Sequence, residues 1–119
     1  MKTAKIEIGG VEYLAIFNNR VLTSMEDAGI KIEDLQKDKP ITNILKMLLF
    51  MINAGSRYAA ATKNGSYPEI DFDNLLDITD QDDYPRFLDT ISACMAGERQ
   101  VDAIPGKKQD AEQDEAPKD

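Results

Sequence analysis

The stretch from Ile41 to Ala61 constrains the fold more than any other part of the chain. On a helical wheel its apolar side chains cover most of the circumference, which leaves only a narrow polar stripe. The stripe consists of Asn43, Lys46, Asn53 and Arg57. A helix that is apolar on nearly all sides has to be buried by other elements or by a partner chain. We therefore predict a long central helix here, with the rest of the chain packed around it.

The same stretch does not have the sequence of a membrane span. Lys46, Asn53 and Arg57 interrupt it, and no apolar run of about 18 residues exists. Residues 1–8 lack the apolar core of a secretory signal. A lone cysteine, Cys94, cannot form an internal disulfide, so nothing indicates an oxidising compartment. We expect a cytoplasmic protein without a membrane partner.

The charge of the chain limits its partners. The 119 residues include 14 basic and 22 acidic side chains, for a formal net charge of -8. Such a chain is repelled by nucleic-acid phosphates and by anionic lipid, whereas a basic protein surface suits it. We expect no nucleic-acid partner.

Alternating apolar and polar residues over 4–17 predict two strands. Gly9 and Gly10 between them favour a two-residue hairpin loop, because its turn needs positive φ angles. A loop of that length pairs Ile8 with Val11. The resulting apolar face should lie on the central helix.

Leu14 and Ile16 lie on the opposite face of this hairpin, where the sequence shows no obvious cover. Two interpretations remain open. Other helices cover both side chains, or the hairpin makes a strand-mediated contact with another subunit.

Capping signals divide the rest of the chain. Asn18 or Asn19 can begin a short helix that ends at Gly29, and Pro40 can open the central helix. Asp71 can cap a two-turn helix.

Asp83 can cap the last helix, and Gly97 should end it. Residues 98–119 are highly charged and contain no aromatic side chain, so they should form a disordered charged tail or linker. We predict an α+β, mainly α fold over residues 1–97, with an N-terminal β-hairpin packed on a small bundle of about four helices.

The residues that catalysis usually needs are scarce. The chain has no histidine, and Cys94 lies on an apolar stripe without a group to activate it. Gly9-Gly10 lacks the lysine of a phosphate-binding loop. We expect neither enzymatic activity nor a cofactor.

Acidic residues cluster between Glu69 and Asp83. A calcium loop beginning at Asp77 would have Asp82 where glycine is required and Leu88 where a bidentate glutamate is required, so the pattern fails. The cluster can supply helix caps and a solvated face, an acidic docking surface for a basic partner, or a catalytic or metal site. We expect no metal.

Phe50 falls inside the polar stripe, between Asn43 and Arg57. Its ring is either buried under the hairpin or the last helix, or exposed as an aromatic anchor in a protein interface.

The order of segments resembles that of the tail assembly chaperones of long-tailed bacteriophages. The similarity covers roughly residues 5–97 and lies in arrangement and pattern. The segments are the hairpin from Lys5 to Phe17, a short helix ending in Ala28-Gly29-Ile30, the long apolar helix, the run Tyr67-Pro-Glu-Ile-Asp-Phe-Asp-Asn-Leu-Leu-Asp, the helix through Phe87, Leu88 and Ile91, and a charged tail.

The resemblance implies a non-enzymatic chaperone of virion assembly that acts in the host cytoplasm and is absent from the mature virion. Such proteins bind the tape measure protein and keep it soluble before the tail tube polymerises around it. A longer form, made by programmed frameshifting, recruits tail tube protein. Gly106-Lys107-Lys108 is compatible with a slippery message.

From the residues themselves we predict the partner-binding surface, together with self-association. The candidates are Leu14, Ile16, Lys46, Phe50 and Arg57. The alternative is a small acidic adaptor or inhibitor module that masks a basic surface of a partner protein through residues 77–83.

Overall fold

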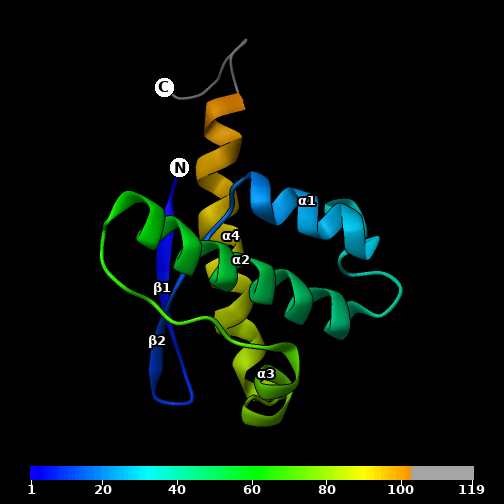
Figure 1. The fold of residues 1–119 in the computed structure, drawn as a ribbon. Helices are drawn as coiled ribbons and strands as arrows, with labels where there is room; N and C mark the ends of the chain where they lie inside the picture. Colours follow the sequence, from blue (N-terminus) through cyan, green and yellow to red (C-terminus); the bar gives the residue numbers. More distant parts are fainter. Residues whose placement is uncertain (103–119) are drawn as a thin grey trace.

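A computed structural model describes residues 1–102, with the backbone alone for residues 97–102. The fold is α+β and mainly α, with an N-terminal hairpin and four α-helices, as the sequence predicts (Figure 1). The elements are β1 (Thr3–Ile8), β2 (Val11–Ile16), α1 (Asn19–Ala28), the 3-10 turn η1 (Ile32–Asp34), α2 (Pro40–Thr62), α3 (Phe72–Ile78), the 3-10 turn η2 (Gln81–Asp83) and α4 (Tyr84–Asp102). The long helix α2 crosses the molecule between the hairpin and α1 and contacts both.

The hairpin has the predicted register. Ile8 pairs with Val11 across the loop, and the two strands are antiparallel. Gly9 and Gly10 have φ angles of 60° and 81°. Positive φ at both positions is the signature of a type I′ turn, whose twist matches that of the flanking strands.

Other helices cover Leu14 and Ile16, which is the first of the two interpretations, so neither side chain is available as an exposed partner-binding residue. Both side chains are buried, as are Tyr13 and Ala15, so four consecutive residues of β2 are shielded from water. Successive side chains of a strand point to opposite faces, so a continuous buried run requires cover on both faces. The helices α2 and α4 both contact the hairpin and provide that cover.

Each outer edge of the hairpin is approached by a helix at one point. In a two-residue hairpin Lys5–Leu14 and Glu7–Glu12 are the pairs whose backbone groups point away from the ladder. Helix α2 meets β2 at Gly55, where an added Cβ would lie 1.8 Å from the carbonyl oxygen of Leu14. At the other edge, the Arg86 guanidinium of α4 donates to the carbonyl oxygen of Glu7.

The first two helices begin and end as predicted. The side chain of Asn18 accepts from the backbone N–H of Val21, and Gly29 ends α1 with a φ of 73°. Helix α2 opens at Pro40 and buries the side chains that the apolar wheel places at its centre, such as Leu48 and Ile52. No helix in residues 1–102 is both long enough and apolar enough to span a bilayer.

The last two helices agree with the sequence in part. Asp71 caps α3 by accepting from the backbone N–H of Asn74, as predicted. The carboxylate of Asp83, however, accepts from the backbone N–H of Asp80 and closes a capping box around η2 in place of the expected cap on α4.

The predicted helix stop at Gly97 is wrong, because α4 continues to Asp102. A glycine inside a helix costs only about 1 kcal/mol relative to alanine, and the residues that follow it, Glu98, Arg99 and Gln100, are good helix formers. The remainder of the predicted disordered tail, residues 103–119, lies outside the described residues.

Candidate functional site

The polar stripe of α2 is a seam that holds the chain's own extended segment 67–72. The Asn53 side chain donates to the carbonyl oxygen of Ile70 and accepts from its backbone N–H, both at 3.0 Å. One turn further along, the Ser56 hydroxyl donates to the carbonyl oxygen of Tyr67 at 2.6 Å. These bonds tie the segment to α2 on its way to α3.

The two charged candidates of the stripe contact this same segment. Arg57 Nε lies 3.5 Å from Glu69 Oε2, and more than half of the Arg57 side chain is exposed. An exposed ion pair of this kind contributes about 0–1 kcal/mol. Lys46 Nζ lies 5.7 Å from the centre of the Phe72 ring, within the range of a cation–π contact. Both side chains therefore have partners within the chain.

Phe50, the third candidate on the stripe, is partly buried and packs against the core. It is not the fully exposed anchor of the interface interpretation. The structure thus brings Lys46, Phe50 and Arg57 to one side of α2, where 67–72 docks, and places Leu14 and Ile16 in the core.

Sequence reasoning missed the roles of Asn53 and Ser56. Their partners lie 17 and 11 positions further along the chain. The polar stripe itself was the available signal, since polar side chains on an otherwise buried helix need hydrogen-bond partners.

An apolar groove lies between α1 and η1. It is a cavity of about 260 Å³ lined by Leu22, Met25, Glu26, Ile30, Lys31, Ile32 and Glu33. Met25 and Ile30 form its buried floor, whereas Leu22 is 41% exposed. We call this cavity the α1 groove. It offers apolar surface that a partner's side chain could cover.

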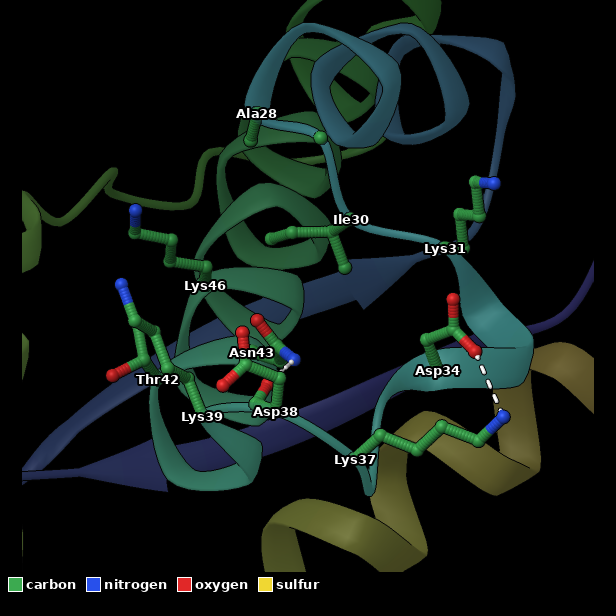
Figure 2. A pocket seen from close by; sticks show the side chains of 11 residues that line it. Ala28, Ile30, Lys31, Asp34, Lys37, Asp38, Lys39, Thr42, Asn43 and Lys46 are labelled. Atoms are coloured by element: carbon green, nitrogen blue, oxygen red, sulfur yellow. Dashed lines mark hydrogen bonds and ion pairs between the residues drawn. The ribbon is translucent and has the colours of Figure 1, made fainter.

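A second cavity of about 620 Å³ adjoins the α1 groove (Figure 2). We call it the lysine cavity. Figure 2 shows Lys39 and Lys46 on one side of it and Lys31 and Lys37 on the other. Its lining consists of Ala28, Gly29, Ile30, Lys31, Asp34, Lys37, Asp38, Lys39, Thr42, Asn43 and Lys46.

Part of that lining is held by interactions within the chain. Lys37 Nζ forms an ion pair with Asp34 Oδ1 at 3.3 Å. The Asn43 side-chain amide donates to the backbone carbonyl of Asp38 at 2.8 Å. These contacts shape the wall between η1 and the start of α2.

The acidic cluster serves first as a set of caps. Asp71, Asp80 and Asp83 each accept a backbone N–H. The pKa of Asp83 is lowered, mainly by the hydrogen bond from the Asp80 backbone and then by the Arg86 side chain. Asp77 and Asp82 are exposed. Within the part of the chain that is described, no three side chains of the metal-binding types are grouped to hold an ion.

Cys94 is buried in α4, as its position on the apolar stripe predicts. Its thiol donates to the carbonyl oxygen of Ala15 at 3.5 Å. Burial raises the pKa of the thiol to about 11. At neutral pH it therefore stays protonated, in the form that is not nucleophilic.

Comparisons of the chain with models of known protein families, with curated proteins and with solved structures found no match.

Proposed function

We propose that the protein is a phage tail assembly chaperone, which binds the tape measure protein and keeps it soluble before the tail tube polymerises around it. The order of hairpin, short helix, long buried helix and two further helices supports the proposal, because the resemblance to this class depends on that order. The chaperone would act in the host cytoplasm and be absent from the mature virion.

The observation that carries the proposal is the α1 groove. Helical clients present apolar side chains at every third or fourth position, and such side chains dock into apolar grooves. Leu22 and the floor formed by Met25 and Ile30 offer this kind of surface. We assign client binding to this groove and no longer to the hairpin face around Leu14 and Ile16, because both of those side chains are buried in the core.

The small size of the groove implies weak binding by each copy. Burial of one leucine side chain contributes roughly 1.5–3 kcal/mol, and association itself costs several kcal/mol. Stable coating of a long client therefore requires several copies side by side, which accounts for the expected self-association. Weak single contacts also allow release when tail tube protein arrives, recruited by a longer frameshifted form.

Co-expression with the tape measure protein of the same phage tests the proposal. The tape measure protein should be insoluble alone and soluble with the wild-type chain. Leu22→Glu should abolish this gain, because it places a charge in the groove. Leu76→Glu is the matched control, since Leu76 on α3 is equally exposed, at 43% against 41% for Leu22. No gain in solubility with the wild-type chain would overturn the proposal.

The acidic adaptor is the second candidate, and the exposure of Asp77 and Asp82 favours it. Those carboxylates could face a basic partner. The salt dependence of partner binding distinguishes the two functions. Attraction between exposed charges is screened within about 8 Å at physiological ionic strength and within about 3 Å at 1 M, so binding through charges weakens as salt rises. Binding that persists at high salt supports the chaperone, and binding that disappears supports the adaptor.

A further inference from the structure

We propose that the α1 groove docks a basic amphipathic helix. The apolar side chains of that helix would enter the groove, and its lysines or arginines would face Glu26 and Glu33. The lysine cavity next to the groove takes no part in this contact. The inference rests on the proposed function, because it names the chemistry of the client segment that the chaperone binds.

The floor of the α1 groove is apolar. Four of the seven lining side chains are hydrophobic, namely Leu22, Met25, Ile30 and Ile32. Met25 and Ile30 are buried, whereas Leu22 is 41% exposed. An amphipathic helix covers surface of this kind with apolar side chains that recur every three or four positions. The floor therefore selects a segment with an apolar stripe.

Both elements that form the groove contribute a carboxylate to its lining. Glu26 belongs to α1 and Glu33 belongs to η1. Both residues are exposed, and among the residues that the structure describes neither carboxylate takes part in an ion pair. The residues that flank the apolar stripe of a docked helix meet the charged rim of its partner, as in coiled coils. Basic flanking residues would therefore pair with these two carboxylates.

Lys31 limits where a basic residue of the partner can bind. It is the remaining charged residue of the groove lining, and it also lines the lysine cavity, so it marks the junction of the two cavities. A lysine or arginine of the partner is repelled at this junction and attracted at Glu26 and Glu33. The formal net charge of -8 adds a long-range attraction for any basic segment. Within the groove, charge complementarity therefore favours a basic partner over an acidic one.

A second copy of this chain suits the groove less well. The exposed large apolar side chains of α3 are Leu76 and Ile78, and Asp73 and Asp77 lie on the same short helix. If α3 of another copy entered the groove, these aspartates would meet the two groove carboxylates. Nucleic acids and anionic lipids carry the same unfavourable sign of charge. A basic helix with leucine or isoleucine at helical spacing suits both the floor and the rim.

Three synthetic helical peptides test the inference. All three share one leucine stripe, and the positions on both sides of the stripe carry lysine, glutamine or glutamate. Fluorescence anisotropy measures their binding to the full chain at low and high salt. The lysine peptide should bind roughly fourfold more tightly than the glutamine peptide at low salt, the combined effect of two exposed ion pairs. The glutamate peptide should bind most weakly, and the differences should shrink as salt rises.

Neutral substitutions at the two carboxylates locate the contact. Glu26→Gln combined with Glu33→Gln should remove the preference for the lysine peptide and leave binding of the glutamine peptide unchanged. Both residues are exposed, so this variant should keep the circular dichroism spectrum and the melting temperature of the wild type. The matched control combines Asp77→Asn with Asp82→Asn, which changes the net charge equally within the acidic cluster. It should keep the preference for the lysine peptide.

Leu22→Ala tests the apolar part of the contact. It should weaken binding of all three peptides by a similar factor, because they share the leucine stripe. Sedimentation velocity of this variant shows whether a second copy uses the groove instead. Self-association should be the same in the variant and the wild type, and its loss in the variant would assign the groove to a second copy and overturn the inference.

Two further outcomes of the peptide experiments would overturn the inference. One is equal binding of the three peptides at low salt, or tightest binding of the glutamate peptide. The other is loss of the lysine preference in the aspartate control, which would assign the basic peptide to the acidic cluster. Because no phage protein is used, these outcomes are separate from the co-expression result. A chain that solubilises its client but binds the three peptides equally would retain the proposed function and lose this inference.

Discussion

Asn53 and Ile70 form a two-point hydrogen-bonded pair in which a side-chain amide takes the place of a neighbouring strand. Both bonds are 3.0 Å long, and both backbone groups of Ile70 are satisfied by one side chain of α2. The Ile70 side chain is itself buried. This pair fixes the path of the segment that leads from α2 to α3.

Asn53→Ala should release that segment. It removes both bonds and leaves two partly buried backbone groups of Ile70 unsatisfied, so we expect a loss of about 1–3 kcal/mol in the free energy of unfolding. Hydrogen exchange should accelerate at the Ile70 amide more than at Leu75. Arg57→Ala is the control, with an expected loss of at most about 1 kcal/mol because its ion pair is exposed. Equal losses of unfolding free energy in the two variants would contradict the role of Asn53 in holding residues 67–72 on α2.

Gly55→Ala should destabilise the protein. Helix propensity alone would favour alanine by roughly 0.5–1 kcal/mol. The new Cβ, however, would lie 1.8 Å from the Leu14 carbonyl oxygen, so α2 and β2 would have to move apart. Overpacking of this kind costs about 1–3 kcal/mol, and urea denaturation should show a net loss. Ala61→Gly, at an exposed position of α2, should cost only about 1 kcal/mol. A stability gain in Gly55→Ala would refute the close approach.

Cys94 should react with a thiol reagent only when the protein opens. Burial raises the pKa of its thiol from 9.0 to about 11, so the folded state holds the proton more tightly than the unfolded state. The resulting stability is fully present below pH 9 and is lost as the pH rises towards 11. The Cys94→Ala variant has no thiol to titrate, so its stability lacks this dependence on pH. The unfolding free energies of wild type and variant should therefore converge or cross between these pH values, and parallel curves would count against a buried thiol.

Asp83→Asn should weaken the turn before α4 at neutral pH. The pKa of Asp83 is lowered by the Asp80 backbone N–H and by Arg86, so the folded state favours its charged form. That contribution is present above pH 3.8 and disappears as the pH falls further towards the folded-state pKa. The stability difference between wild type and variant should therefore shrink in acid. Asp82→Asn serves as the control, because Asp82 takes part in the turn through its backbone N–H.

Local signals made much of the fold predictable. The glycine pair at 9–10 determines the turn and with it the register of the hairpin. Asn18, Gly29 and Asp71 mark helix ends through contacts within a few residues of themselves. Each of these signals is complete within one short window of sequence.

Contacts between distant segments were not predictable in the same way. The bond from Arg86 to Glu7 joins residues 79 positions apart. Strand alternation places Leu14 and Ile16 on one face but does not say how many layers cover the sheet. The α1 groove forms where α1 meets η1, and the lysine cavity forms where η1 meets the start of α2. Neither is predictable from local signals, because both depend on the path of the loop between the two helices.

The helix contacts at the two hairpin edges have a consequence for a protein proposed to handle aggregation-prone clients. A bare strand edge is a template on which further chains can stack into fibrils. Here Gly55 brings α2 against one edge, and Arg86 donates to the Glu7 carbonyl at the other. The hairpin is therefore a poorer template for cross-β growth than one with two bare edges.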